Sequence, residues 1–254
     1  MTLVTFTYDY KARKIKLEEI LDNMDKINEV EVLPRDENFT YKNGYKSWVS
    51  SIFIDIRNST ELIENNSELK VAKVIRGFTS EIIEILRKDT DKLKEIGIRG
   101  DCVYAIYSSP AQKDIYDLTD RAYYINTYLK MLNSLLSKRN LPKITAGIGL
   151  ATSQTLVVKA GRHSSGINNL VWIGESVSIA CNLANIANKE IDDSILLSSN
   201  FHYNYSKYIE QYAQEEKKTL NYYKRCEHER YGTFYHASII MSAFNKWIKD
   251  DMPV

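Results

Sequence analysis

Two aspartates in this 254-residue chain lie where a carboxylate needs a partner. Asp55 is part of the apolar run IFIDI, which has the composition of a buried strand, and Asp101 follows Gly100 between two short apolar runs. A buried carboxylate is unfavourable unless it is ion-paired, protonated or bound to a metal ion. If the fold brings the two side chains together they repel each other, and a shared divalent cation relieves that repulsion. The sequence therefore points to a metal site built from Asp55 and Asp101.

The segments around these aspartates predict the elements that position them. Residues 48–56 are expected to form a strand. A helix is expected to begin at Ser59 or Thr60, either of which can cap it, and to continue to Arg87. Residues 93–109 are expected to form two short strands that meet in a hairpin at the Gly-Asp pair.

The rest of the chain completes an α+β pattern. Further elements are expected as a helix over 113–138, a strand over 144–152, a strand over 170–174, a helix over 175–189 and a short strand over 194–199. The order strand-helix-strand-strand-helix-strand is that of the ferredoxin-like fold, whose first and third strands are neighbours, so Asp55 and Asp101 are expected side by side. Outside this core, helices are expected around 236–250 and over 11–30, where apolar residues recur at helical spacing (Ile15, Leu17, Ile20, Leu21 and Met24).

The composition is that of a water-soluble globular protein. Hydrophobic residues make up 44% and charged residues 26%, and the formal net charge is +1, so the overall balance favours neither a nucleic-acid nor a membrane partner. Cys102, Cys181 and Cys226 are widely spaced, which suits reduced thiols. No apolar run approaches the roughly 18 residues of a membrane span, and the N-terminus lacks the pattern of a signal peptide. We expect a cytoplasmic protein.

Four segments of the chain resemble the class III nucleotide cyclases. FIDIRNST resembles the family's F-x-D-I-x-G-F-T segment, IRGDCVYAIY its Gly-Asp hairpin, ITAGIGLATSQTLVVKAG the strand and glycine turn that follow, and WIGESVSIACNLANIA the G-x-x-V-N-x-A-A-R-L helix. All four occur in the family order within about 48–200. The resemblance implies a ferredoxin-like βαββαβ cyclase domain over 47–200, an N-terminal extension over 1–46 and a C-terminal extension over 201–254 that packs on the core.

The resemblance also implies the chemistry of the site. In this family the ribose 3′-hydroxyl of a nucleoside triphosphate attacks its own α-phosphorus, which releases diphosphate and closes a 3′,5′-cyclic monophosphate. Carried over by position, Asp55 and Asp101 are the catalytic carboxylates that hold two divalent metal ions, Mn²⁺ or Mg²⁺, with the carbonyl of Ile56 as a further ligand. Members of the family are head-to-tail dimers with two shared active sites, so a homodimer is implied.

At two positions where purine cyclases read the base with polar side chains, this chain departs from the family. They are Gly97 and Val171 here, which makes the usual recognition of adenine or guanine unexpected. Phe53 matches a base-contacting position and shares a strand face with Asp55, and Arg99 shares a face with Gly97. We expect both to bind nucleotide. The pattern resembles the bacterial pyrimidine cyclases of antiphage defence, which make cyclic CMP or cyclic UMP as a messenger for a separate effector protein.

A further departure concerns the family's asparagine and arginine on the dimer helix, which steady the ribose and the developing charge. These positions are Ser178 and Asn182, one helical turn apart and therefore on one face, and both are expected near the nucleotide. Either another cation replaces the arginine, with Arg99, Arg162 or Lys159 as candidates, or the enzyme is slow. Two alternatives stay open: an adenylate or guanylate cyclase with an atypical base pocket, and a catalytically silent homologue that binds nucleotide.

Overall fold

The computed structural model describes residues 7–22, 26–161 and 168–253, and the chain forms two compact units. One unit comprises Met1–Trp48 and Gln154–Gly174, and the other comprises Val49–Ser153 and Glu175–Val254. The boundaries fall within two long strands, β2 (Asn43–Ile56) and β5 (Ala146–Gly161). Both predicted aspartates belong to the second unit.

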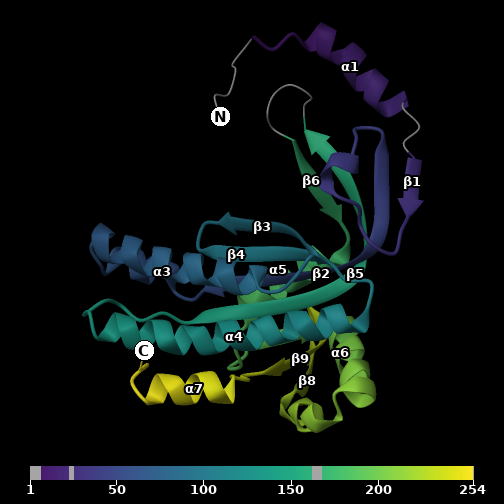
Figure 1. The fold of residues 1–254 in the computed structure, drawn as a ribbon. Helices are drawn as coiled ribbons and strands as arrows, with labels where there is room; N and C mark the ends of the chain where they lie inside the picture. Colours follow the sequence, from purple (N-terminus) through teal and green to yellow (C-terminus); the bar gives the residue numbers. More distant parts are fainter. Residues whose placement is uncertain (1–6, 23–25, 162–167, 254) are drawn as a thin grey trace. The chain divides into compact units, whose positions relative to one another are not determined.

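A mixed sheet forms the centre of the second unit (Figure 1). Its strands lie in the order β3-β4-β2-β5-β7-β9-β8. Beside β2 and β5 they are β3 (Leu93–Arg99), β4 (Cys102–Ser108), β7 (Ile195–Ser198), β8 (Lys224–His228) and β9 (Gly232–Ala237). The strand β4 pairs with both β2 and β3 in antiparallel sense. This arrangement confirms the predicted ferredoxin-like α+β fold, with the first and third core strands as neighbours.

The alternating side chains of β2 divide between the two faces of the sheet. Ile52, Ile54 and Ile56 face the main hydrophobic core, where they pack with residues of two long helices, α3 (Glu68–Arg87) and α4 (Gln112–Ser137). Figure 1 shows both helices running along the sheet. Because strand side chains alternate, Phe53 and Asp55 point to the opposite face.

The opposite face of the sheet is covered by α5 (Glu175–Ile186) at very short range. A Cβ atom on Gly149 would lie 2.1 Å from the carbonyl oxygen of Ala180, and one on Gly147 would lie 2.3 Å from that of Ala184. Real Cβ atoms do not approach backbone oxygens so closely, so only glycine permits this contact between strand and helix. The two glycines of the predicted strand thus fix how near α5 lies to the sheet.

The single helix predicted from Ser59 or Thr60 to Arg87 is wrong, because two helices occupy this segment. They are α2 (Ser59–Glu64) and α3, and the residue before α2 is Asn58, in a left-handed conformation with φ of 52°. The Nδ2 of Asn66 donates to the carbonyl of Leu62 at 3.0 Å, and Ser67 is extended before α3. Asparagine and serine compete in this way with the helical backbone, which explains the interruption.

The segment after residue 199 contains more regular structure than its sequence indicated. Besides the expected helix α7 (Ser242–Lys249), it forms α6 (Ser199–Tyr212), the 3₁₀ segment η2 (Gln214–Tyr222) and the hairpin of β8 and β9. Tyr205 and Tyr223 enter the main core, where both hydroxyls hydrogen-bond to that of Tyr123, at 2.8 and 2.9 Å. Tertiary contacts with α4 therefore order this tyrosine-rich segment.

The first unit combines a helix with short strand pairings. Its elements are α1 (Tyr10–Asp22), β1 (Lys26–Glu29), η1 (Asp36–Asn38), β6 (Asn168–Ile173) and the adjoining parts of β2 and β5. β1 pairs with β2 in parallel, and β6 pairs with β5 in antiparallel sense. The predicted helix within 11–30 is present, but no residue of it is buried, and Leu21 is 72% exposed. Met24, expected on the same apolar stripe, lies outside the described residues.

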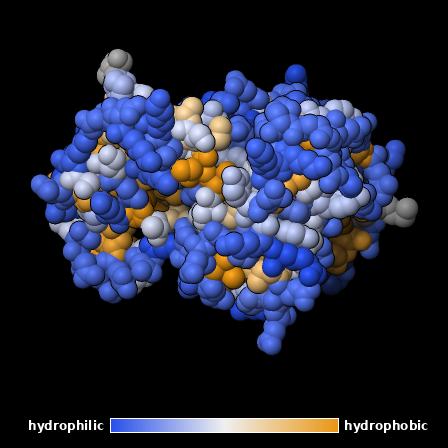
Figure 2. Space-filling model, turned by 90° about the horizontal axis from the view of Figure 1, so that it is seen from below, coloured by the Kyte–Doolittle hydropathy of each residue, from blue (hydrophilic) through white to orange (hydrophobic). Residues whose placement is uncertain are grey.

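The surface shown in Figure 2 is mostly hydrophilic, with hydrophobic residues in small separate groups. Groups of this kind are common on protein surfaces and need no special explanation. Among the described helices, none combines the length and apolarity that crossing a membrane requires.

Candidate active site

Asp55 and Asp101 lie at the same end of two neighbouring strands. Asp55 is paired with Cys102 in the antiparallel register of β2 and β4, and Asp101 immediately precedes Cys102 in the turn between β3 and β4. Gly100, the first residue of this turn, has φ of 64°, a conformation that glycine adopts without strain. The structure thus brings together two carboxylates that are far apart in the sequence.

The environment of Asp55 disfavours its charged form. Burial is the largest cause that raises the pKa of this carboxyl above its ordinary value, and the neighbouring Asp101 raises it further. Arg57 and Lys189 act in the opposite direction but do not cancel the effect. An additional cation at this position would therefore be stabilised by both carboxylates.

Arg57 is a site residue that the sequence analysis did not identify. Its side chain is only 6% exposed and pairs with the carboxylate of Asp55. Its Nη2 also donates to the carbonyls of Asp55 and Ala184, each at 3.0 Å, and its Nη1 donates to the carbonyl of Asn185 at 2.6 Å. Carbonyls at a helix C-terminus lack intrahelical partners, so Arg57 joins the end of α5 to the aspartate. Its position two residues after Asp55, just beyond the end of β2, was the available signal.

The donor atoms around the two aspartates suit a hard divalent cation. Carboxylate and backbone carbonyl oxygens are the ligands that Mg²⁺ and similar ions prefer, and Asp55, Asp101 and the carbonyl of Ile56 supply such atoms. Among the described residues, no group of three or more His, Cys, Asp or Glu side chains is placed to hold a metal ion. Metal ions at this position therefore require further oxygen atoms, such as those of a triphosphate or water.

Phe53 and Tyr104 form an aromatic pair next to the aspartates. The two residues face each other in the register of β2 and β4, and their rings stack with centroids 5.1 Å apart and planes inclined by 13°. Phe53 is 8% exposed, and Tyr104 donates its hydroxyl to Glu95 on β3 at 2.6 Å. Burial, followed by the hydrogen bond to Glu95, raises the pKa of Tyr104 to about 12. The sequence analysis predicted Phe53 here but not Tyr104.

Arg99 is in register with Cys102, the first residue of β4. It is exposed at the end of β3, and its charge lowers the pKa of the Cys181 thiol, which burial raises overall. Ser178 and Asn182 are exposed on the same helix, one turn apart, and Ser178 donates its hydroxyl to the carbonyl of Glu175 at 3.2 Å. The charge of Arg99 thus acts on α5, the helix that carries the other two predicted nucleotide-binding residues.

The remaining candidates belong to the first unit or lie outside the described residues. Lys159 and Val171 belong to the first unit, where the Nζ of Lys159 lies 6.0 Å from the centre of the Tyr41 ring and Val171 is 41% exposed. Arg162 lies outside the described residues. Arg99 belongs to the same unit as the two aspartates and ends the strand that pairs with β4.

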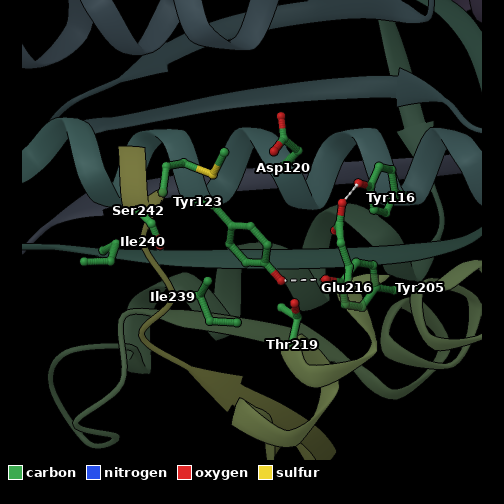
Figure 3. Close-up of a pocket in the computed structure, with 10 residues that line it drawn as sticks. Tyr116, Asp120, Tyr123, Tyr205, Glu216, Thr219, Ile239, Ile240 and Ser242 are labelled. Carbon is green, nitrogen blue, oxygen red and sulfur yellow. Dashed lines mark hydrogen bonds between the residues drawn. The ribbon is translucent and has the colours of Figure 1, made fainter. Parts of the chain in front are cut away.

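A cavity of about 290 Å³ elsewhere in the second unit contains none of the predicted site residues (Figure 3). It lies among α4, α6, η2 and the segment 239–242. Tyr116 donates its hydroxyl to Glu216 at 2.6 Å, and the Tyr123 and Tyr205 hydroxyls hydrogen-bond across its wall. The hydroxyls of these three tyrosines thus all have hydrogen-bond partners on the wall, as buried tyrosines usually do.

Known proteins with the same fold or a related sequence agree with this geometry, although no protein-family model matches the chain. The structure resembles the adenylyl cyclase CyaB from P. aeruginosa, with a TM-score of 0.60 over 76% of this chain and 94% of that chain, at 18% sequence identity. A protein from Treponema porcinum named uridylate cyclase is 43% identical over 251 residues, which is 98% of this chain and 84% of the relative. The chain therefore belongs to the class III nucleotide cyclase family.

Within this class, the sequence relatives share one name. A second protein, from Gulbenkiania mobilis, is also named uridylate cyclase and is 29% identical over 255 residues, with 96% of this chain and 97% of the relative covered. The family resemblance stated from the four sequence segments is confirmed, and the enzyme class is nucleotide cyclase.

Proposed function

We propose that the protein cyclises a pyrimidine nucleoside triphosphate, with UTP as the preferred substrate and CTP as the second candidate. The observation that carries the proposal is the pair Asp55 and Asp101 at neighbouring strand ends, in a chain related over nearly its full length to a uridylate cyclase. UTP and CTP differ at the base only in O4 and the N4 amine, an acceptor against a donor. The name of the relatives favours UTP.

The reaction forms one phosphorus–oxygen bond and breaks another. The ribose 3′-oxygen bonds to the α-phosphorus, the bond to the bridging oxygen breaks, diphosphate leaves, and the hydroxyl proton passes to solvent. Asp55, Asp101 and the carbonyl of Ile56 are the proposed ligands of two divalent cations, Mn²⁺ or Mg²⁺. Bound there, such ions would lower the pKa of the hydroxyl and offset the phosphate charge. Arg57 is proposed to hold the Asp55 carboxylate in place from the side of α5.

A homodimer is part of the proposal because the exposed face of α5 would otherwise carry nucleotide-binding residues facing water. Ser178 and Asn182 are proposed to contact nucleotide bound mainly by a partner subunit, in the head-to-tail arrangement that the family resemblance implies. Arg99 is proposed as the cation that stabilises developing negative charge, since a preorganised positive charge in that role contributes orders of magnitude to the rate.

The cyclic product is proposed to act as a messenger in antiphage defence, read by a separate effector protein. This part rests on the family resemblance and on the uridylate cyclase relatives. The purine-cyclase alternative and the silent-homologue alternative make different predictions for one experiment.

That experiment incubates the purified protein with Mn²⁺ and all four ribonucleoside triphosphates and identifies the products by mass spectrometry. Cyclic UMP or cyclic CMP supports the proposal and names the base. A cyclic purine overturns the base assignment, and bound nucleotide without any product supports the silent homologue. Asp55→Asn and Asp101→Asn should each abolish turnover. Asp89→Asn is the matched control, because Asp89 is 85% exposed and its left-handed conformation suits asparagine.

A further inference from the structure

The ring of Tyr104 occupies the space that a side chain at residue 97 would need. The two residues are opposite each other in the register of β3 and β4. A Cβ atom built on Gly97 would lie 2.3 Å from Cζ of Tyr104 and 2.4 Å from its hydroxyl oxygen. Contacts this short do not occur between real atoms, so a side chain at 97 and the observed Tyr104 ring exclude each other.

The ring of Tyr104 is held on three sides in this position. It stacks on Phe53, its hydroxyl donates to Glu95, and it packs at the edge of a small cluster that includes Ala151 of β5 and Ala180 of α5. A stacked aromatic pair contributes about 0.5–1.5 kcal/mol beyond the area it buries. The hydrogen bond has a carboxylate acceptor, which makes it stronger than one between neutral groups. These contacts hold the Tyr104 ring in one position.

The Tyr104 ring lies close to the proposed reaction centre. Tyr104 and Phe53 lie two residues along their strands from the Cys102–Asp55 pair, a separation of roughly 7 Å at the usual rise per residue. Both rings lie on the sheet face that carries Asp55. A base attached to a ribose whose phosphates are at the aspartates has to pack within this distance, and aromatic faces are favourable surfaces for bases.

We propose that Tyr104 is a specificity-determining residue, whose ring fills the space over Gly97 and so leaves room for a one-ring base but not for a purine. The inference rests on the proposed function and deepens it, since it assigns pyrimidine selectivity to a named side chain. It also states why Gly97 carries no base-reading side chain: the tyrosine occupies that volume. Shape here replaces the polar recognition that a lysine or glutamate would supply.

The test compares nucleotides on the wild type, Tyr104→Ala and Tyr104→Phe. Activity is measured as kcat/KM for UTP, CTP, ATP and GTP. Binding is measured separately with 3′-deoxy-UTP and 3′-deoxy-ATP, which lack the attacking hydroxyl and cannot be cyclised. Tyr104→Ala should shift the pyrimidine-to-purine ratio toward purines by about 10- to 100-fold, the range that a steric change in a pocket produces. Tyr104→Phe keeps the ring and should keep the ratio, and Tyr212→Ala, at a 64% exposed tyrosine, is the surface control.

Each outcome of this test either supports or overturns the inference about Tyr104. An unchanged ratio in folded Tyr104→Ala, or a wild type that binds 3′-deoxy-ATP as well as 3′-deoxy-UTP, overturns the inference. If Tyr104→Ala does not fold, Tyr104→Leu retains apolar packing on Phe53 with a smaller side chain, and the same ratio is read. If the wild type cyclises nothing, the proposed function fails, whereas the two 3′-deoxy nucleotides still report whether Tyr104 selects by size. The double variant Gly97→Ala with Tyr104→Ala should be more stable than Gly97→Ala alone, because the steric conflict is removed.

Discussion

Replacing Arg57 by glutamine should destabilise the protein far more than replacing an exposed arginine. The guanidinium is paired with Asp55 and donates to the carbonyls that end α5, and its side chain is 6% exposed. Removing one member of a buried ion pair costs about 3–5 kcal/mol. The Asp55 side chain is 25% exposed, so water screens part of the loss, and we expect about 2–3 kcal/mol. In a protein of this size that corresponds to a decrease in Tm of roughly 5–10 °C.

The measurement is urea unfolding followed by circular dichroism at pH 7 without added metal. Arg57→Lys restores the charge but not the forked donor geometry, so it should recover only part of the loss. The cycle of Arg57→Gln, Asp55→Asn and the double variant should give a coupling energy of about 1–2 kcal/mol, as expected for residues in direct contact. The control is Arg87→Gln, at an arginine whose side chain is 60% exposed and 3.2 Å from Glu84.

The control is expected to change the free energy of unfolding by no more than about 0.5 kcal/mol. An Arg57→Gln variant as stable as Arg87→Gln would falsify the reasoning, because burial and the four acceptor groups would then carry no net free energy. A large loss without coupling to Asp55 would assign the stabilisation to the end of α5 alone. In that case Arg57 would not position the aspartate.

Three further predictions concern the core. Ser50 and Ser51 are adjacent and fully buried, but the Ser50 hydroxyl is 3.0 Å from a threonine hydroxyl on β5 and the Ser51 hydroxyl has no partner among the described residues. Ser50→Ala should therefore lower the free energy of unfolding by about 1 kcal/mol, whereas Ser51→Ala should leave it unchanged or raise it. Equal losses of unfolding free energy in urea would contradict this. Gly149→Ala should lower the free energy of unfolding by at least about 3 kcal/mol, since its Cβ would meet a helix carbonyl at 2.1 Å; a soluble variant with unchanged Tm would show that α5 can move away at little cost. Burial lowers the pKa of His202 to about 4, so between pH 6.5 and 4 the unfolded chain binds more protons than the folded one. The free energy of unfolding should therefore fall by about 1–2 kcal/mol as the pH decreases through that window, after allowance for the partial exposure of the imidazole. His202→Phe should flatten this part of the stability profile, and an equally steep profile in the variant would assign the effect to other groups.

The strands and hairpin that carry the aspartates could be predicted from the sequence because their signals are local. Alternating apolar residues around Asp55 define the strand and its two faces, and a Gly-Asp pair between short apolar runs defines the hairpin. The order of elements then limits the topology to one in which Asp55 and Asp101 are neighbours. The resemblance to class III cyclases rests on the same local segments. The sequence therefore determined the fold class and the two carboxylates.

Only the tertiary structure decided which side chains surround those carboxylates. Arg57 reaches a carbonyl 128 residues further along the chain, at Asn185, and no local pattern reports a contact of that kind. The ring of Tyr104 lies over Gly97 because the two residues are opposite each other in the hairpin and the hydroxyl donates to Glu95. No local pattern distinguishes this tyrosine from others in apolar strands. Sequence periodicity indicates which face a residue occupies. Packing between distant segments determines what that residue touches, and recognition of a base depends on those contacts.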